Sequence, residues 1–225
     1  MTFRTPMFLA LLALTACGSD APGEPAPDDG VPSDLSDPEG HPPIVGDGPR
    51  TAGLRRFTVD ELQATIAIVA GPDENGEPIH WEVDANGQTV DGLSDEGFGT
   101  MLGRPDYVSV TAEDGSPNTL YVKFVRDMAR GVCDQIVAAD LTRTSGHTLW
   151  RYAPVTSVAT EAEVTENLSY LVLRWLGHRT EAGHPMLEGY RQVYETSLLA
   201  GGAAQSEGWR GVCIALFEDP AFHIH

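Results

Sequence analysis

Apolar side chains that recur at helical spacing constrain the fold of this chain more than any other feature of its sequence. Residues three or four apart lie on one face of an α-helix, so a stripe with this spacing indicates a helix with one buried side. The first stripe runs from Val59 to Val69. Four more occupy residues 120–136, 164–175, 187–198 and 209–217. The sequence therefore predicts a mainly α-helical domain of about five helices over residues 51–225, with the stripes forming its core.

The beginning and end of the first helix can also be predicted. Thr58 is followed three residues later by Glu61, the spacing of a capping box, in which each side chain bonds the other residue's backbone N–H. Gly71, directly after the stripe, is a typical helix terminator.

A long insertion separates the first two stripes. Residues 72–117 are rich in glycine, aspartate and proline, which favours loops. Within them Ile79, Trp81 and Val83 alternate with polar residues before an Asn86-Gly87 pair, as in a strand leading into a tight turn. We expect a loop-rich insertion that could contain a short β-hairpin.

The N-terminus has the features of an export signal. Arg4 supplies a positive charge, and residues 7–14 are apolar but too short to span a hydrocarbon core of about 30 Å. The run ends in Leu14-Thr15-Ala16-Cys17, which resembles the lipobox of bacterial lipoproteins. This resemblance implies that residues 1–16 form a signal peptide and that Cys17 carries the lipid, including a palmitate-type acyl chain. An ordinary secretory signal with a chance cysteine is the alternative.

The resemblance to lipoproteins also implies a location. Gly18, rather than aspartate, follows the cysteine, which favours the outer membrane. We therefore expect a chain anchored in the outer membrane through its lipid, on the periplasmic or the cell-surface side. Several acyl chains hold such a protein far more firmly than one chain does.

Residues 17–50 have the composition of a disordered tether. From residue 18 onward this stretch contains eight of the sixteen prolines and eight acidic residues, with almost no large apolar side chains. Such a segment cannot bury enough apolar surface to offset the entropy lost on ordering. Its extended reach is on the order of 100 Å at about 3.1 Å per residue. A spacer with no binding role of its own is the simplest interpretation.

The charge and the cysteines narrow the possible partners. The formal net charge is −19 at pH 7, and removal of Arg4 with the signal makes it one unit more negative. This charge repels nucleic acids, so no nucleic-acid partner is expected. Cys133 and Cys213 both follow Arg-Gly-Val, and in an oxidising compartment we expect them to form a disulfide. Two buried free thiols are the alternative.

Common catalytic and nucleotide-binding motifs are missing from the sequence. It has no Gly-x-Ser-x-Gly, no phosphate-binding loop, no Gly-x-Gly-x-x-Gly and no His-Glu-x-x-His. His178 with His184, and His223 with His225, are weak candidates for metal ligands, and we interpret the C-terminal pair as solvated tail residues. We predict no catalytic residue, no metal site and no cofactor.

Two further charged features have structural interpretations. Oxygen-bearing residues alternate between Asp84 and Asp91, but the glycine and the final glutamate of a calcium loop are missing, so an acidic turn is the better interpretation. Arg55 and Arg56 precede an acidic helix start, where a local salt bridge is more common than a site for an anionic ligand.

Two sets of residues in the folded part resemble known groups of proteins. The first set comprises Arg55-Arg56-Phe57-Thr58, Glu61-Leu62, Thr65 and Gly71. It resembles the helix that opens domains of unknown function in planctomycete-type and myxobacterial cytochrome-associated proteins. The second set comprises Leu102-Gly103-Arg104-Pro105-Asp106-Tyr107, Glu113-Asp114, Lys123-Phe124, Asp127-Met128-Ala129 and Val132-Cys133. It is similar to uncharacterised lipoproteins of myxobacterial type.

Both resemblances imply a setting rather than an activity. The C-terminal segment from Trp209 to Phe222 fits both groups. Covalent haem attachment requires Cys-x-x-Cys-His, whereas Cys133 is followed by Asp134-Gln135-Ile136, so this chain is not expected to carry haem.

Three functions are consistent with the sequence. The first is a non-catalytic accessory lipoprotein that binds another protein of the cell envelope. Its docking surface would include Trp81, Phe98 and Tyr107, unless these aromatic residues complete the domain's own core. The second is a redox-associated module acting beside a separate c-type cytochrome. The third is a hydrolase with an unrecognised site in the 72–117 insertion.

The lipobox generates the first testable prediction. Cys17→Ser removes the thiol that would accept the lipid, so the variant should remain an unprocessed precursor without incorporated fatty acid. Labelling of growing cells with a radioactive or alkyne-bearing fatty acid measures this, with the unsubstituted chain as the positive control. Normal labelling of the variant would contradict the assignment.

Overall fold

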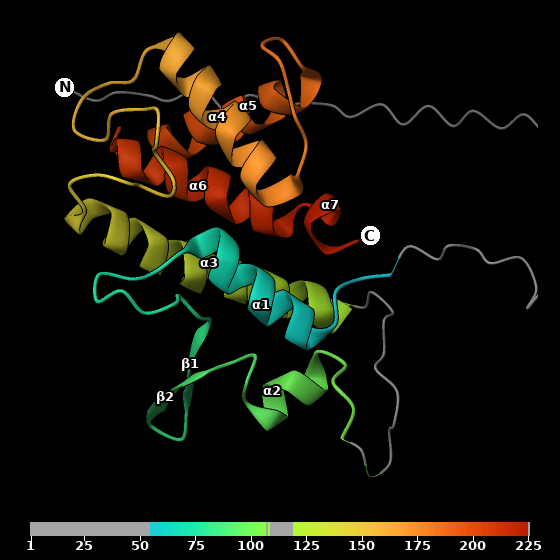
Figure 1. The fold of residues 1–225 in the computed structure, drawn as a ribbon. Helices are drawn as coiled ribbons and strands as arrows, with labels where there is room; N and C mark the ends of the chain where they lie inside the picture. Colours follow the sequence, from blue (N-terminus) through green and yellow to red (C-terminus); the bar gives the residue numbers. More distant parts are fainter. Residues whose placement is uncertain (1–54, 107, 109–118, 225) are drawn as a thin grey trace, which may run out of the picture. The chain divides into compact units, whose positions relative to one another are not determined.

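Helices dominate the described part of the chain (Figure 1). The structure, a computed structural model, describes residues 55–106, 108 and 119–224. The helices of this part are α1 (Val59–Ala70), α2 (Glu96–Met101), α3 (Thr119–Thr142), α4 (Glu161–Leu176), α5 (Pro185–Ala200), α6 (Gln205–Glu218) and α7 (Pro220–His223). The five helices predicted from the apolar stripes are confirmed as α1, α3, α4, α5 and α6.

α1 begins and ends where the sequence predicts. The Thr58 hydroxyl accepts the Glu61 N–H at 3.1 Å, and the Glu61 carboxylate accepts the Thr58 N–H at 2.9 Å. Hydrogen bonds from Arg55 and then from the Thr58 backbone lower the pKa of Glu61 to about 2. The helix ends at Gly71, whose φ of 73° lies in the region that favours glycine.

The expected hairpin is also present. Strands β1 (Glu82–Ala85) and β2 (Gln88–Asp91) pair antiparallel, with Val83 opposite Val90. Asn86 and Gly87 join them with φ values of 57° and 79°. Two consecutive positive φ angles are typical of the tight turn that matches the twist of a two-stranded ribbon.

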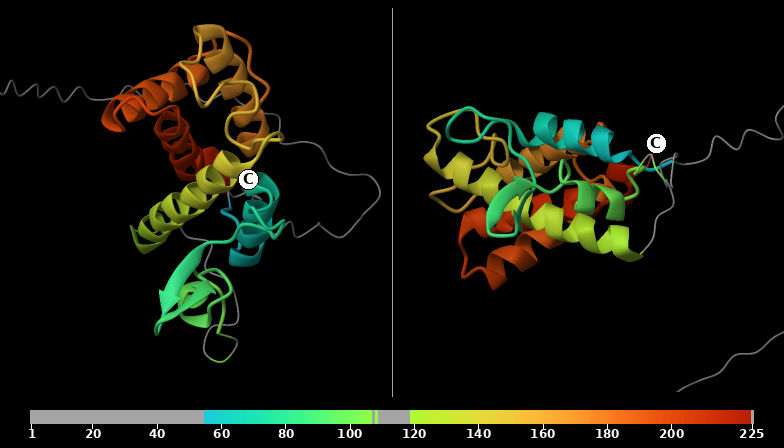
Figure 2. Two further views of the ribbon diagram at one scale, coloured as in Figure 1. Left: turned by 90° about the vertical axis from the view of Figure 1, so that its left-hand side faces the viewer. Right: turned by 90° about the horizontal axis from the view of Figure 1, so that it is seen from below.

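The hydrophobic core is centred on α6. This helix packs against α3, α4, α5 and α7, and Figure 2 shows it between the other long helices. Trp209, Val212, Leu216 and Phe217 of α6 are completely buried. Such burial stabilises a fold by roughly 1.5–3 kcal/mol for each large apolar side chain.

A disulfide joins α3 to α6. Cys133 and Cys213 are bonded, with their Cα atoms 5.9 Å apart and 80 positions apart in sequence, so the predicted bond is confirmed. Both side chains are buried. Closing a loop of this length contributes about 4 kcal/mol to stability in the chain-entropy model.

Glycines allow α5 and α6 to approach each other closely. A Cβ on Gly208 would lie 2.6 Å from the Tyr194 ring, and one on Gly211 would overlap the Ser197 side chain. The backbone of α6 therefore lies directly against side chains of α5, and larger residues would force the two helices apart.

Two short helices are not evident from the sequence. α2 has six residues and α7 has four, which is too short for a helical period to show. Their starting signals are local, because Asp95 accepts the Phe98 N–H and Asp219 accepts the Ala221 N–H.

The interpretation of His223 as a solvated tail residue is wrong. Its side chain is buried, with Nδ1 3.0 Å from the Tyr121 hydroxyl and Nε2 2.5 Å from the Phe217 carbonyl oxygen. α7 turns the end of the chain back over the core, where Phe222 packs edge to face on Phe217. His225, its proposed companion, lies outside the described residues.

Two glycines offer a matched test of the α5–α6 contact. Gly208→Ala should lower the free energy of unfolding by about 1–3 kcal/mol, because the new methyl group overlaps the buried Tyr194 ring. Gly189→Ala, on the exposed side of α5 with nothing within 4 Å, should raise it by up to about 1 kcal/mol through helix propensity. Urea unfolding measures both, and equal effects of the same sign would refute the proposed packing.

Candidate functional site

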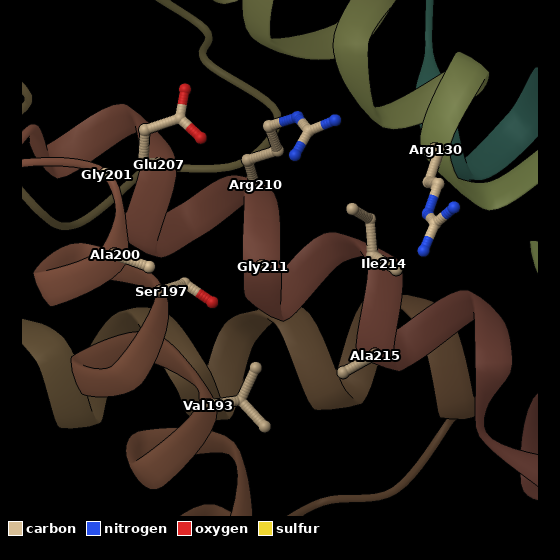
Figure 3. A pocket seen from close by; sticks show the side chains of 10 residues that line it. All are labelled: Arg130, Val193, Ser197, Ala200, Gly201, Glu207, Arg210, Gly211, Ile214 and Ala215. Carbon is tan, nitrogen blue, oxygen red and sulfur yellow. The ribbon is translucent and has the colours of Figure 1, made fainter.

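A groove lies over α6 between α3 and α5. The cavity has a volume of about 480 Å³ and is lined by Arg130 of α3 together with residues of α5, α6 and the turn between them (Figure 3). Figure 2 shows α3 and α5 flanking α6 and diverging from each other. The floor of the groove is therefore one helix, and its walls are two others.

Small and apolar side chains form most of the groove surface. Gly211 and Ala215 of α6, and Ser197 of α5, leave the backbones close to the surface. Val193 and Ile214 add larger apolar groups, and both are only partly buried. Small residues on a helix surface allow another backbone to approach closely, so the groove offers both depth and apolar area.

Charged side chains stand at the rim of the groove. Arg210 of α6 donates to the Asp134 carboxylate of α3, which raises the pKa of Arg210. Glu207 lies on the same side of α6 (Figure 3). Within the described part of the chain, Arg130 has no carboxylate within ion-pair distance, which leaves its guanidinium available to a ligand.

The structure corrects the expected docking surface in the insertion. Trp81 is only 4% exposed, so its assignment as an interface anchor is wrong. Its ring lies 5.6 Å from that of Phe98 and 6.0 Å from that of Phe124 of α3. Phe98 is half-buried in the same cluster, and Tyr107 lies outside the described residues. The alternation from Ile79 to Val83 marks the side of the chain leading into β1 that faces the core, not an interface.

The paired arginines before α1 have local roles. Arg55 forms a salt bridge of 2.7 Å with Glu61, as preferred from the sequence. Arg56 is buried, donates to the Leu102 carbonyl oxygen at 2.6 Å and lies 4.4 Å from the centroid of the Tyr121 ring. Both guanidinium groups therefore stabilise the fold around α1.

Two other candidate metal ligands, His184 and Asp84, are engaged in a helix cap and a turn, whereas His178 is exposed. His184 caps α5, with Nδ1 accepting the Met186 N–H at 3.3 Å. Asp84 accepts the Gly87 N–H at 2.8 Å within the hairpin turn. Over residues 55–106, 108 and 119–224, no three histidine, cysteine or acidic side chains are grouped as metal ligands would be. Cys17 lies outside this part of the chain.

The buried carboxylate of α3 has a structural role. Asp140 is 1% exposed and accepts the N–H groups of Thr148 and Leu149, each at 2.7 Å for its Oδ2 atom. Arg143 donates to its other oxygen at 2.7 Å. These bonds hold the chain that follows α3 against the helix end, and a carboxylate this fully engaged is poorly suited to proton transfer.

Burial changes the pKa of Tyr190 of α5. Burial and a hydrogen bond of 2.6 Å to Asp219 raise the pKa of Tyr190 far above its ordinary value. The phenol therefore stays protonated and joins α5 to the start of α7.

Small residues on one face of α6 are a signal for the groove, but the apolar stripe beside them makes this signal hard to recognise in the sequence. Gly211 and Ala215, one helical turn apart, lie beside the apolar stripe of α6. A stripe of core residues identifies the buried face of a helix, but the neighbouring face is recognised as a groove only when the positions of α3 and α5 are known.

Comparisons with known proteins add no evidence about these assignments. No protein family, no curated protein and no solved structure matches the chain. The resemblances to lipoproteins and to cytochrome-associated domains stay predictions. Within the described ranges, no helix combines the length and the apolar character that crossing a bilayer requires.

The lack of an ion pair at Arg130 within the described residues predicts that this side chain contributes little to folding. Arg130→Ala should change the free energy of unfolding by no more than about 0.5 kcal/mol. Trp209→Ala, at a completely buried position of α6, should lower it by about 3–5 kcal/mol. Chemical denaturation of the two variants checks this, and a large loss for Arg130→Ala would show that its guanidinium has a structural partner.

Proposed function

We propose that this chain is a lipid-anchored, non-catalytic protein of the bacterial cell envelope that binds a helical segment of another envelope protein in the groove over α6. The observation that carries the proposal is the groove itself, with its small-residue floor and its available guanidinium. The lipobox and the acidic stretch after it support the anchoring part of the proposal, including attachment to the outer membrane.

The shape of the groove favours a helix as its occupant. Its walls, α3 and α5, flank a floor of Gly211 and Ala215. An amphipathic helix that presents small apolar residues can lie against such a floor, as helices do in other hydrophobic grooves. A strand has no unpaired sheet edge to extend here, because helices and the turn between α5 and α6 line the groove.

The charges specify what this helix should carry. Arg130 offers a planar guanidinium that can bind a carboxylate through two hydrogen bonds. Arg210 is already bonded to Asp134, so Arg130 is the arginine of the groove that remains to bind a carboxylate of the partner. We therefore expect one such carboxylate and not several. We infer a partner helix with a small apolar face and one aspartate or glutamate directed towards Arg130.

A tethered anchor would favour this kind of binding. A domain held near a membrane by a flexible segment meets other membrane-bound proteins at a high effective concentration. Moderate affinity in the groove is then sufficient for a stable association. The net charge of −19 also disfavours nonspecific contact with anionic lipid headgroups.

Photocross-linking in the native envelope tests the proposal. A photoreactive residue in place of Ile214 should yield a discrete cross-linked product in cells that carry the lipidated full chain. Arg130→Glu should reduce this yield at least about tenfold, because it opposes the partner's carboxylate and each factor of ten corresponds to about 1.4 kcal/mol. The product, identified by mass spectrometry, should contain an acidic residue on a helical segment.

Matched controls make the result specific. Arg179→Glu makes the same change of charge outside the groove and should leave the yield unchanged. The photoreactive residue at Val158, which is 82% exposed and outside the groove, should not give the product. Recovery of the monomer alone from the Ile214 position, in cells where the chain is lipidated, would overturn the proposal.

A further inference from the structure

A second groove follows the outer face of α4 and shares no lining residue with the groove over α6. Two cavities of about 270 and 730 Å³ adjoin there, since Glu166 and Ser169 line both. Arg179, Thr180 and Ala182, from the segment after α4, line the opposite side. Figure 1 shows this segment returning along α4 towards the start of α5.

Two tyrosines form one end of this groove. Tyr152 and Tyr170 pack edge to face with their ring centroids 5.6 Å apart and an interplanar angle of 79°. The Arg151 guanidinium lies 5.9 and 5.6 Å from the two centroids and holds both rings in place. Tyr152 is 43% exposed although it packs against the Tyr170 ring, so part of its own ring is open to solvent. The rings therefore offer a rigid apolar surface to solvent.

Uncompensated polar groups lie beside the rings. Glu166 and Arg179 line the same cavity, yet neither forms an ion pair or a hydrogen bond within the described part of the chain. The Thr180 hydroxyl is buried and has no hydrogen-bond partner there. Glu166 and Arg179 are exposed, so the groove presents one hydrogen-bond acceptor and one donor group to a ligand.

This combination gives simpler ligand classes no net advantage. Glu166 and Arg179 line the same cavity of about 270 Å³, so an anion attracted by Arg179 is repelled by Glu166, and a cation attracted by Glu166 is repelled by Arg179. A purely apolar ligand would leave the carboxylate and the guanidinium desolvated without partners. The ligand should be neutral and rich in hydroxyl groups, with one flat apolar face for the tyrosines.

We infer that this groove binds a neutral oligosaccharide of pyranose sugars. A pyranose ring has an apolar face of C–H groups, which can lie on the Tyr152 ring, and a rim of hydroxyl groups, which can donate to Glu166 and accept from Arg179. The cavity that continues along α4 past Ser169 accommodates the following sugar units. Hydroxyl groups at Thr160, Thr165 and Ser169 line this extension.

Binding of defined tetrasaccharides to the full chain tests the inference. The mature lipidated protein, kept in a detergent without a sugar headgroup, is titrated with tetramers of glucose and of N-acetylglucosamine by isothermal calorimetry. We expect saturable binding of at least one tetramer with a Kd of about 1 mM or tighter. Tyr152→Ala and Glu166→Gln should each weaken it at least tenfold, whereas Tyr152→Phe, which keeps the ring, should weaken it less than threefold.

The controls separate this site from the groove over α6. Arg130→Glu should leave the affinity for the tetramer unchanged, and circular dichroism should show unaltered helix content for every variant. Absence of saturable binding of both tetramers up to about 10 mM would overturn the inference. Binding that survives both Tyr152→Ala and Glu166→Gln would also overturn it. Displacement of the tetramer by an acidic tetrapeptide would show that the groove takes peptides instead.

Discussion

The burial of α6 is the constraint on which the rest of the structure depends. A helix that packs against four others must contact each of them with a different set of side chains. α6 does so with aromatic residues on one side and glycines on another. The disulfide to α3 fixes the rotation of α6 about its axis, because Cys213 can meet Cys133 in only one orientation. Once α6 is oriented in this way, Gly211 and Ala215 must face the space between α3 and α5.

This arrangement explains why the groove remains open. α5 approaches α6 closely only where Gly208 and Gly211 admit the side chains of Tyr194 and Ser197. α3 is held on α6 by the disulfide and, at the surface, by the ion pair of Arg210 with Asp134. Each wall is therefore fixed to the floor by contacts of its own. A cavity between rigidly held helices is preorganised, so a ligand that binds it does not incur the cost of rearranging the fold.

The sequence predicts the features that depend on local chemistry or on one-dimensional periodicity. The capping box at Thr58, the turn at Asn86 and the five long helices belong to this class, because neighbouring residues determine them. The disulfide follows from matching contexts around two cysteines. The predictions of Trp81 in an interface and of His223 as a solvated residue are wrong, because burial depends on which distant segment covers a residue. The grooves could not be predicted for the same reason, since neither exists until several helices are placed together.

The loop-rich insertion contributes buried side chains to the hydrophobic core. Trp81 packs with Phe98 against Phe124 of α3, and its ring lies directly on Gly92, where a Cβ atom would come within 2.6 Å of it. Gln135 of α3 donates to the backbone carbonyl oxygen of the residue before Trp81 at 2.8 Å. The insertion therefore covers one face of α3, while the disulfide to α6 occupies another. Arg130 lies between these two covered faces, and for this reason its guanidinium is directed into the groove over α6 instead of into a contact within the fold.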